Sequence, residues 1–190
     1  MAEQGPVTVR PKGKIYGQGL GANCWDGDLE TYNSDSIGFG SRLRTLSIDL
    51  SQIPANSVIK SVTYYICAYR TGNKDYCGLA AALGYATGTS ENEQKRVTPL
   101  QAIDLTAHRT KQTTSATQAG LEEYSAQILA AQTPILWLEI YGDHKYYEIW
   151  TEITYEPDES KIYSGDAKVS AVYVGDTKAS AVYVGTTKVL

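Results

Sequence analysis

Two glutamates in adjacent predicted strands come nearest to a catalytic arrangement. Apolar periodicity predicts strands at 134–141 and 146–155, joined by a loop at 142–145. In a hairpin with this loop, Glu139 would lie opposite Glu148, and two carboxyl groups about 5 Å apart suit retaining glycoside hydrolysis. The sequence holds no other feature of a hydrolase cleft. We therefore expect a protein that is not an enzyme.

The same hairpin would surround the two glutamates with aromatic rings. Trp137 would lie opposite Trp150, and Tyr141 opposite Tyr146, while the other face of the hairpin would form the core through Leu136, Leu138, Ile140, Tyr147, Ile149 and Ile153. So many rings on an outward face should be covered, in order of preference by the predicted helix or a loop, by a neighbouring subunit or by a saccharide. The four rings and two glutamates are thus binding or interface candidates. A register shift of one residue would move one strand's rings into the core.

Other candidate sites carry weaker signals. The acidic residues within 26–30 are spaced like part of a calcium loop, but the distal glutamate of that motif is missing, which favours a solvated turn. The three cysteines lack the spacing of metal ligands. Cys67 and Cys77 flank a predicted turn at 71–74, so the sequence leaves open a disulfide or buried free thiols. We expect no metal and no cofactor.

Composition narrows the possible partners. The chain has 17 Lys and Arg against 21 Asp and Glu, a net charge of −4, without a basic run, so we expect no nucleic-acid partner. It lacks eighteen consecutive apolar residues, and its N-terminus does not resemble a secretory signal. We expect no membrane insertion and no export through a signal peptide.

Strand patterns predict an all-β fold. Residues 42–50 alternate cleanly, 58–69 should point Val62, Tyr64, Ile66 and Ala68 inward, and 77–87 read as a buried strand. Apolar residues at helical spacing predict one short helix within 119–131. We predict a β-sandwich with an N-terminal arm at 1–157, and a charged, proline-containing boundary before an appendage at 158–190.

The appendage repeats with a period of ten residues. Gly-X steps at 165–166, at Gly175-Asp176 and at Gly185-Thr186 separate short β-prone runs, which predicts tight hairpins and a meander with strands at 167–174 and 177–184. A sheet this small is marginal alone, and its edges invite pairing with other chains. We therefore expect this β-hairpin repeat to serve assembly or attachment.

Two stretches resemble known proteins. Tyr173-Val-Gly-Asp-Thr-Lys178 and Tyr183-Val-Gly-Thr-Thr-Lys188 resemble the tandem repeats that end tail-fibre, head-fibre and other virion-surface proteins of phages and prophages of Gram-positive bacteria. Asp49-Leu-Ser-Gln-Ile-Pro54, followed by a Val-Ile-Lys-Ser-Val strand, is similar to jelly-roll sandwiches of adhesive and virion-surface domains.

These resemblances imply a structural role in a tail fibre, baseplate or head fibre. They imply a jelly-roll-like sandwich and a homo-oligomer, preferably a trimer, that joins other virion proteins and touches host-surface glycans. Synthesis in the host cytoplasm and release with the virion would explain the missing signal peptide. The alternative from the sequence is a monomeric carbohydrate-binding module or a bacterial surface adhesin.

Overall fold

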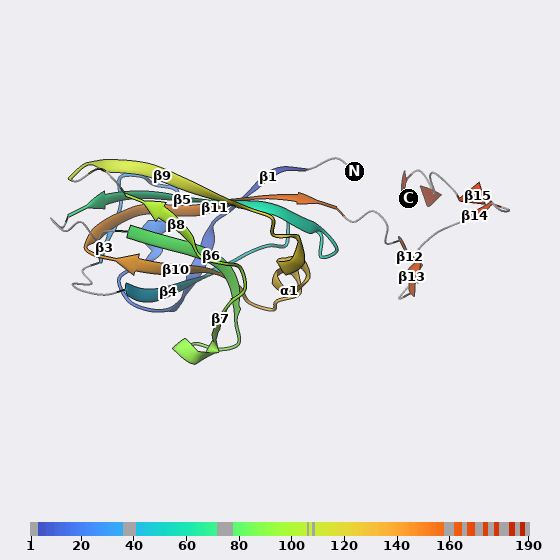
Figure 1. Cartoon of the computed structure of the whole chain (residues 1–190), viewed down its shortest axis with the longest axis horizontal. Coiled ribbons are helices and arrows are strands. Elements are labelled where there is room, and N and C mark those ends of the chain that lie inside the picture. The colour runs from blue at the N-terminus through green and yellow to red at the C-terminus, as the bar shows by residue number, and fades with distance from the viewer. Residues whose placement is uncertain are drawn as a thin grey trace.

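A computed structural model describes residues 4–35, 41–71, 78–105, 107 and 109–157, and short stretches at 162–164, 167–169, 173–174, 177–178, 183–184 and 187–188. The main part is a sandwich of two antiparallel sheets, which Figure 1 shows as two layers. Sheet A contains β1 (Gln4–Val9), β3 (Asn33–Asp35), β5 (Val58–Arg70), β9 (Lys111–Ala119) and β11 (His144–Glu156). Sheet B contains β2 (Pro11–Tyr16), β4 (Ser41–Ile48), β6 (Gly78–Ala86), β7 (Gln94–Arg96), β8 (Gln101–Asp104) and β10 (Pro134–Tyr141).

The strand order is that of a jelly roll. Sheet A runs β1-β11-β5-β9, with β3 beside β11, and sheet B runs β2-β4-β10-β6-β7, with β8 beside β6. The chain passes from one sheet to the other at each step from β1 to β6, and again at each step from β8 to β11. Such alternation between two packed sheets is typical of jelly-roll-like sandwiches. The predicted all-β sandwich is confirmed.

The core lies between the sheets and follows the predicted alternation. On β5, Val62, Tyr64, Ile66 and Ala68 are all buried, as the pattern of the strand indicated. The facing strand positions of sheet B are equally buried, among them Leu46, Leu136, Leu138 and Ile140. Burial of these aliphatic side chains, about 1.5–3 kcal/mol for each, is the main force that holds the sheets together.

One end of the sandwich is closed by a helical turn shorter than the prediction (Figure 1). Gly120 has a φ of 72° and starts it. A 3-10 turn, η3 (Glu122–Tyr124), then leads into the five-residue α1 (Ser125–Leu129). Leu121 and Ile128 are buried in the core, and the Ser125 hydroxyl accepts a 2.8 Å hydrogen bond from the backbone N–H of Ile59. Further 3-10 turns are η1 (Ala22–Cys24) and η2 (Glu91–Glu93). In the described ranges, no helix is long and apolar enough to span a bilayer.

The predicted hairpin of residues 134–155 is wrong. β10 pairs with β4 and β6 in sheet B, whereas β11 pairs with β1, β3 and β5 in sheet A. The two residues between them, Gly142 and Asp143, therefore turn the corner from one sheet to the other, and Gly142 supplies a φ of 82°. A short glycine turn serves both geometries, so the local sequence does not distinguish a hairpin from a corner.

The repeat forms short antiparallel pairs, each across one Gly-X step. These pairs are β12 (Ile162–Ser164) with β13 (Ala167–Val169), β14 (Tyr173–Val174) with β15 (Thr177–Lys178), and β16 (Tyr183–Val184) with β17 (Thr187–Lys188). Antiparallel pairs thus lie on both sides of each predicted turn. The described strands are two or three residues long, whereas the prediction had strands of eight residues. Gly175, Asp176 and Gly185 lie outside the described residues.

Candidate functional site

The six candidate residues divide between opposite sheets. Trp137, Glu139 and Tyr141 lie on β10, with side chains on the outer face of sheet B. Tyr146, Glu148 and Trp150 belong to β11 in sheet A. The predicted pairing of Glu139 with Glu148 is therefore wrong, and with it the carboxylate pair that suggested glycoside hydrolysis.

The aromatic residues of β11 do not all lie on the faces of the strand that the predicted register assigns to them. The register of β11 against β5 shifts between Tyr146 and Glu148. Tyr146 consequently enters the core with no exposed surface, whereas Tyr147, predicted as core, is half-buried against Tyr32. Trp150 stacks on Tyr65, with ring centroids 4.9 Å apart and planes 1° from parallel. Trp150 is thus already engaged by its own sheet.

Glu148 is a buried structural carboxylate. It is 2% exposed and accepts hydrogen bonds from Arg10 Nε at 3.1 Å and from the backbone N–H of Gly27 at 3.0 Å. Arg10 lies between β1 and β2, and Gly27 belongs to the loop after η1. Glu148 therefore ties two chain segments to sheet A.

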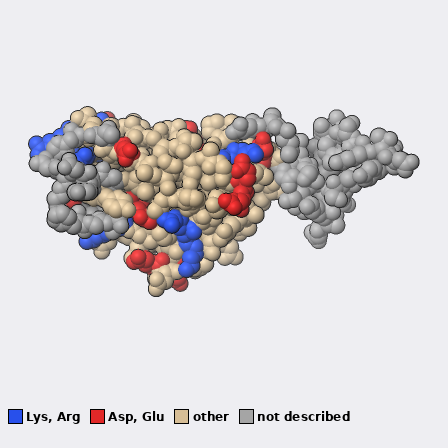
Figure 2. Space-filling view, in the orientation of Figure 1, with Lys and Arg blue, Asp and Glu red and all other residues tan. Residues whose placement is uncertain are grey.

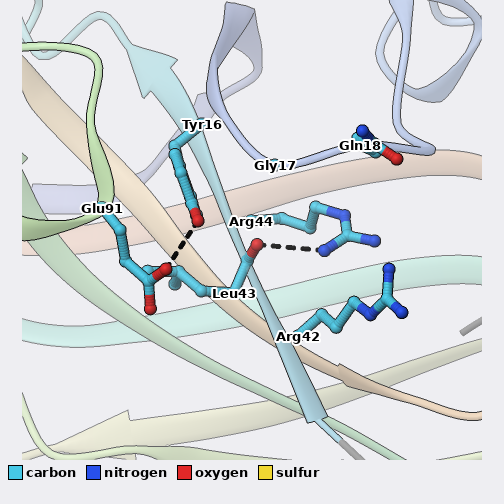
Figure 3. A pocket seen from close by; sticks show the side chains of 7 residues that line it. All are labelled: Tyr16, Gly17, Gln18, Arg42, Leu43, Arg44 and Glu91. Carbon is cyan, nitrogen blue, oxygen red and sulfur yellow. Dashed lines mark hydrogen bonds between the residues drawn. The ribbon is translucent and has the colours of Figure 1, made fainter.

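Trp137 and Glu139 line a groove on the outer face of sheet B. They contribute to a hollow of about 660 Å³ that also contains Leu43, Glu91, Asn92, Gln94 and Lys95. A second hollow, of about 460 Å³, is lined by Tyr16, Gly17, Gln18, Arg42, Leu43, Arg44 and Glu91 (Figure 3). The two hollows adjoin at Leu43 and Glu91, and we call the first of them, with Tyr16 at its far end, the sheet B groove. Its residues come from β2, β4, β10 and the segment 87–96. Arg42 and Arg44 occupy β4 positions that pair with the core residues Ile140 and Leu138, so they lie on the opposite face of sheet B from Trp137.

The segment 87–96 forms one wall of the groove and is held by a buried glutamine. Gln94 is 4% exposed, its Oε1 accepts a hydrogen bond from the Thr45 hydroxyl at 2.9 Å, and its Nε2 donates to the carbonyl oxygens of Gly88 and Ser90. A capping box between Ser90 and Glu93 fixes the turn η2. These hydrogen bonds lower the pKa of Glu93.

A glycine lets this wall approach the sheet. A Cβ atom at Gly84 would lie 2.1 Å from the carbonyl oxygen of Lys95. Only glycine therefore fits between β6 and β7 at this point. The close approach places Lys95 beside the groove.

The groove holds its polar groups in fixed orientations. Glu139 accepts hydrogen bonds from Trp137 Nε1 at 3.3 Å and from the Tyr141 hydroxyl at 3.2 Å, and forms an ion pair with Arg96 Nη1 at 3.6 Å. At the other end, the Tyr16 hydroxyl donates a 2.6 Å hydrogen bond to Glu91. That bond raises the pKa of Tyr16, so the phenol stays neutral.

This arrangement suits a saccharide. The C–H face of a sugar ring packs against an aromatic ring, while its hydroxyl groups need planar donors and acceptors nearby. Trp137 and Leu43 supply the apolar surface, and Glu139 and Asn92 supply polar groups. Tyr141 and Glu139 belong to the same hydrogen-bonded cluster.

Sequence reasoning missed several groove residues. Tyr16, Leu43 and Glu91 are far apart in the chain and carry no motif. Their only early signal was the alternation of residues 42–50, which places Leu43 and Thr45 on the outer face. The pairing of β4 with β10 brings Leu43 opposite Glu139.

The acidic turn and the cysteines form no second site in the described part of the chain. Asp26 and Asp28 accept hydrogen bonds from backbone N–H groups two residues onward, at 2.8 Å each. Among the described residues, no three His, Cys, Asp or Glu are grouped as metal ligands. Cys67 is a buried free thiol, and Cys77 lies outside the described residues.

Charge on the face in view is dispersed. Figure 2 shows blue and red atoms in small separate groups on a predominantly uncharged surface. Along the described part of that face, no continuous track of cations could follow a phosphate backbone.

Comparison with known proteins adds no assignment. No model of a known protein family matches the chain, and no curated protein is similar to it in sequence. Function must therefore be inferred from the groove and the repeat.

Proposed function

We propose that the chain is a non-enzymatic surface component of a phage or prophage particle, in a tail fibre, baseplate or head fibre. The C-terminal repeat assembles it, with a trimer favoured, or attaches it to other virion proteins. The jelly roll is displayed outward, and the sheet B groove contacts a glycan of the host surface.

The observation that carries this proposal is the identical pairing of two repeat units. Tyr173 pairs with Lys178 as Tyr183 pairs with Lys188, and in each unit the next Val pairs with the Thr. Strand pairs this short are marginal alone, so repeated units of this kind gain stability by packing against a partner, either neighbouring chains or the sandwich itself. The same residues resemble repeats of virion-surface proteins, and this resemblance supports a place on the surface of a phage or prophage particle.

The first expected result concerns assembly. The full chain should have the mass of a trimer by light scattering, and a chain ending at Pro157 should be a monomer. The shortened chain should keep its thermal unfolding transition, because the core residues of the sandwich all precede residue 158. A full-length monomer would contradict self-assembly and leave attachment to another virion protein, or the monomeric carbohydrate-binding module, as the readings to pursue.

The second expected result separates the two tryptophans. Replacing Trp137 by Ala should weaken saccharide binding by tenfold or more, on the order of the loss of one stacked ring. Replacing Trp150 by Ala, a matched loss of one indole on the opposite sheet, should leave binding unchanged. Binding would be measured on a glycan array and then by calorimetry. Equal losses for the two variants would exclude the groove as the binding surface.

A further inference from the structure

We propose that the free edge of β9 receives the C-terminal repeat of a second copy of this chain, which adds a strand to sheet A. The inference rests on the assembly role proposed above for the repeat, and it names the surface on which the repeat docks. It follows from a comparison of the strands that end the two sheets.

β9 is an open edge of sheet A. It pairs with β5 along its nine residues without a register shift, and no described strand pairs with its other side. The backbone N–H of Gly120 donates to the carbonyl oxygen of Lys60 at 3.1 Å, and in an antiparallel ladder only alternate residues face the partner strand. The N–H and C=O groups of Thr113, Ser115 and Thr117 therefore point away from β5.

The other edge strands carry features that discourage pairing with another chain. β1 contains Pro6 and one register shift, and β2 contains Pro11, Lys12 and Lys14 and two register shifts. β3, β7 and β8 are only three or four residues long. Proline, charge, bulges and short length are the usual protection of a sheet edge. From residue 112 to residue 119, β9 has none of them.

The edge is held in place by the side chains that point into the sandwich. Gln118 accepts a 3.0 Å hydrogen bond from the Tyr64 hydroxyl and donates to the carbonyl oxygen of Pro99 at 2.9 Å. The Thr114 hydroxyl donates to the carbonyl oxygen of Asp104 at 3.2 Å. An incoming strand therefore meets an edge that is already ordered, which lowers the entropy cost of binding.

The repeat lacks what the edge of β9 offers. Its described strands pair only in twos and are two or three residues long, and such small sheets are marginal in water. In Figure 1 these pairs lie beyond the end of the sandwich and not along β9. In the described part of a single chain, both the edge and the repeat thus lack a partner strand. A second copy supplies each with the other.

The path of the chain allows this exchange. β11 and β9 both run antiparallel to β5, and Glu156 and Ala119 lie opposite Val58 and Ser61, near the same end of β5. The repeat therefore leaves sheet A at the end where β9 stops, and copies that meet at this end bring the repeat of one close to β9 of the next. Because each copy gives one repeat and receives one, the contact is head-to-tail and can close into a ring, such as the favoured trimer.

The first test places a proline in the middle of this edge in the full chain. Ser115→Pro removes an outward N–H and leaves the hydrogen bonds to β5 in place, so the added strand should be lost while the sandwich stays folded. The dissociation constant of the oligomer, measured by analytical ultracentrifugation, should rise by about tenfold or more. Ser115→Thr, which keeps the N–H, should leave that constant unchanged.

Hydrogen exchange of the unaltered full chain tests the same contact without a variant. The outward amides of Thr113 and Ser115 should exchange as slowly as the inward amides of Thr114 and Ala116. Alternate fast and slow amides along β9 would show an open edge and would overturn the inference.

The outcomes separate this inference from the proposed function. An oligomer that tolerates Ser115→Pro and exchanges its outward amides quickly would mean that the repeat assembles alone, which keeps the assembly role and rejects the docking surface. A chain ending at Pro157 that forms an oligomer sensitive to Ser115→Pro would mean that β9 pairs with β9 of another copy, and would reject the repeat as the occupant. A full-length monomer would reject self-assembly and this inference with it.

Discussion

Lowering the pH from 7 to 5 is expected to reduce the free energy of unfolding by about 2 kcal/mol through one histidine, His144. His144 is 1% exposed at the start of β11, and burial lowers its pKa to about 4. In the unfolded chain this histidine has a pKa of about 6.5. Between this pH and about 4, the unfolded chain therefore binds a proton at His144 that the folded chain does not bind. Stability is full above that pH and falls as the pH drops towards 4, where the loss reaches about 3 kcal/mol.

The charges around His144 set the size of this effect. Arg70 disfavours the imidazolium, while Asp143 and the Gly142 backbone favour it, and desolvation is the largest of these influences. Nδ1 lies 3.1 Å from the Tyr146 hydroxyl, and Nε2 is buried with no hydrogen-bond partner among the described residues.

Urea unfolding between pH 4 and 8 measures the effect. His144→Gln should lose stability at neutral pH but show little change between pH 7 and 5. Carboxylates with lowered pKa values, such as Asp49 beside Lys12, lose their contribution only below their unfolded pKa of about 3.9. An unaltered slope in His144→Gln would contradict the assignment.

Replacing Glu148 by Ala is expected to destabilise the protein by about 3 kcal/mol, because two charge-assisted hydrogen bonds are lost from a buried carboxylate. Arg10 is half exposed and can return to water, which keeps the cost near the lower end for a buried pair. The N-terminal strands and the loop around Gly27 should loosen together. Chemical unfolding and hydrogen exchange at the Gly27 amide report both effects.

Glu139 provides the matched control for this prediction. It is partly exposed and pairs with the surface residue Arg96, so Glu139→Ala should cost less than about 1 kcal/mol. In the groove, however, the same change removes the acceptor that orients Trp137 and Tyr141, and should weaken saccharide binding. Glu148→Ala should leave binding intact at temperatures where it is folded. A large loss of stability in Glu139→Ala together with a loss of binding in Glu148→Ala would contradict the roles inferred for the two glutamates.

The candidate site was only half predictable. Trp137, Glu139 and Tyr141 share a face because alternate residues of any strand do, and β10 is regular. Tyr146 was misplaced because the register of β11 shifts next to it, an irregularity that alternation cannot reveal. Leu43 could be placed beside Glu139 only after its strand had been paired with β10.

The sequence by itself determined which residues of the regular strands are buried and where the chain turns. Side-chain alternation in β5 and β10 specifies their inner faces, and glycine marks the turn at Gly142 and the steps of the repeat. These properties depend on neighbours along the chain, so they are readable locally.

Only the tertiary structure decided which strands pair. Gly142 and Asp143 could close a hairpin or turn a corner, and the choice depends on whether β4 and β6 are available to flank β10. That competition is settled by the burial of two long apolar strands between sheets, a non-local quantity. It separated Glu139 from Glu148 and Trp137 from Trp150, and it brought Trp137 beside Leu43 and the wall formed by residues 87–96.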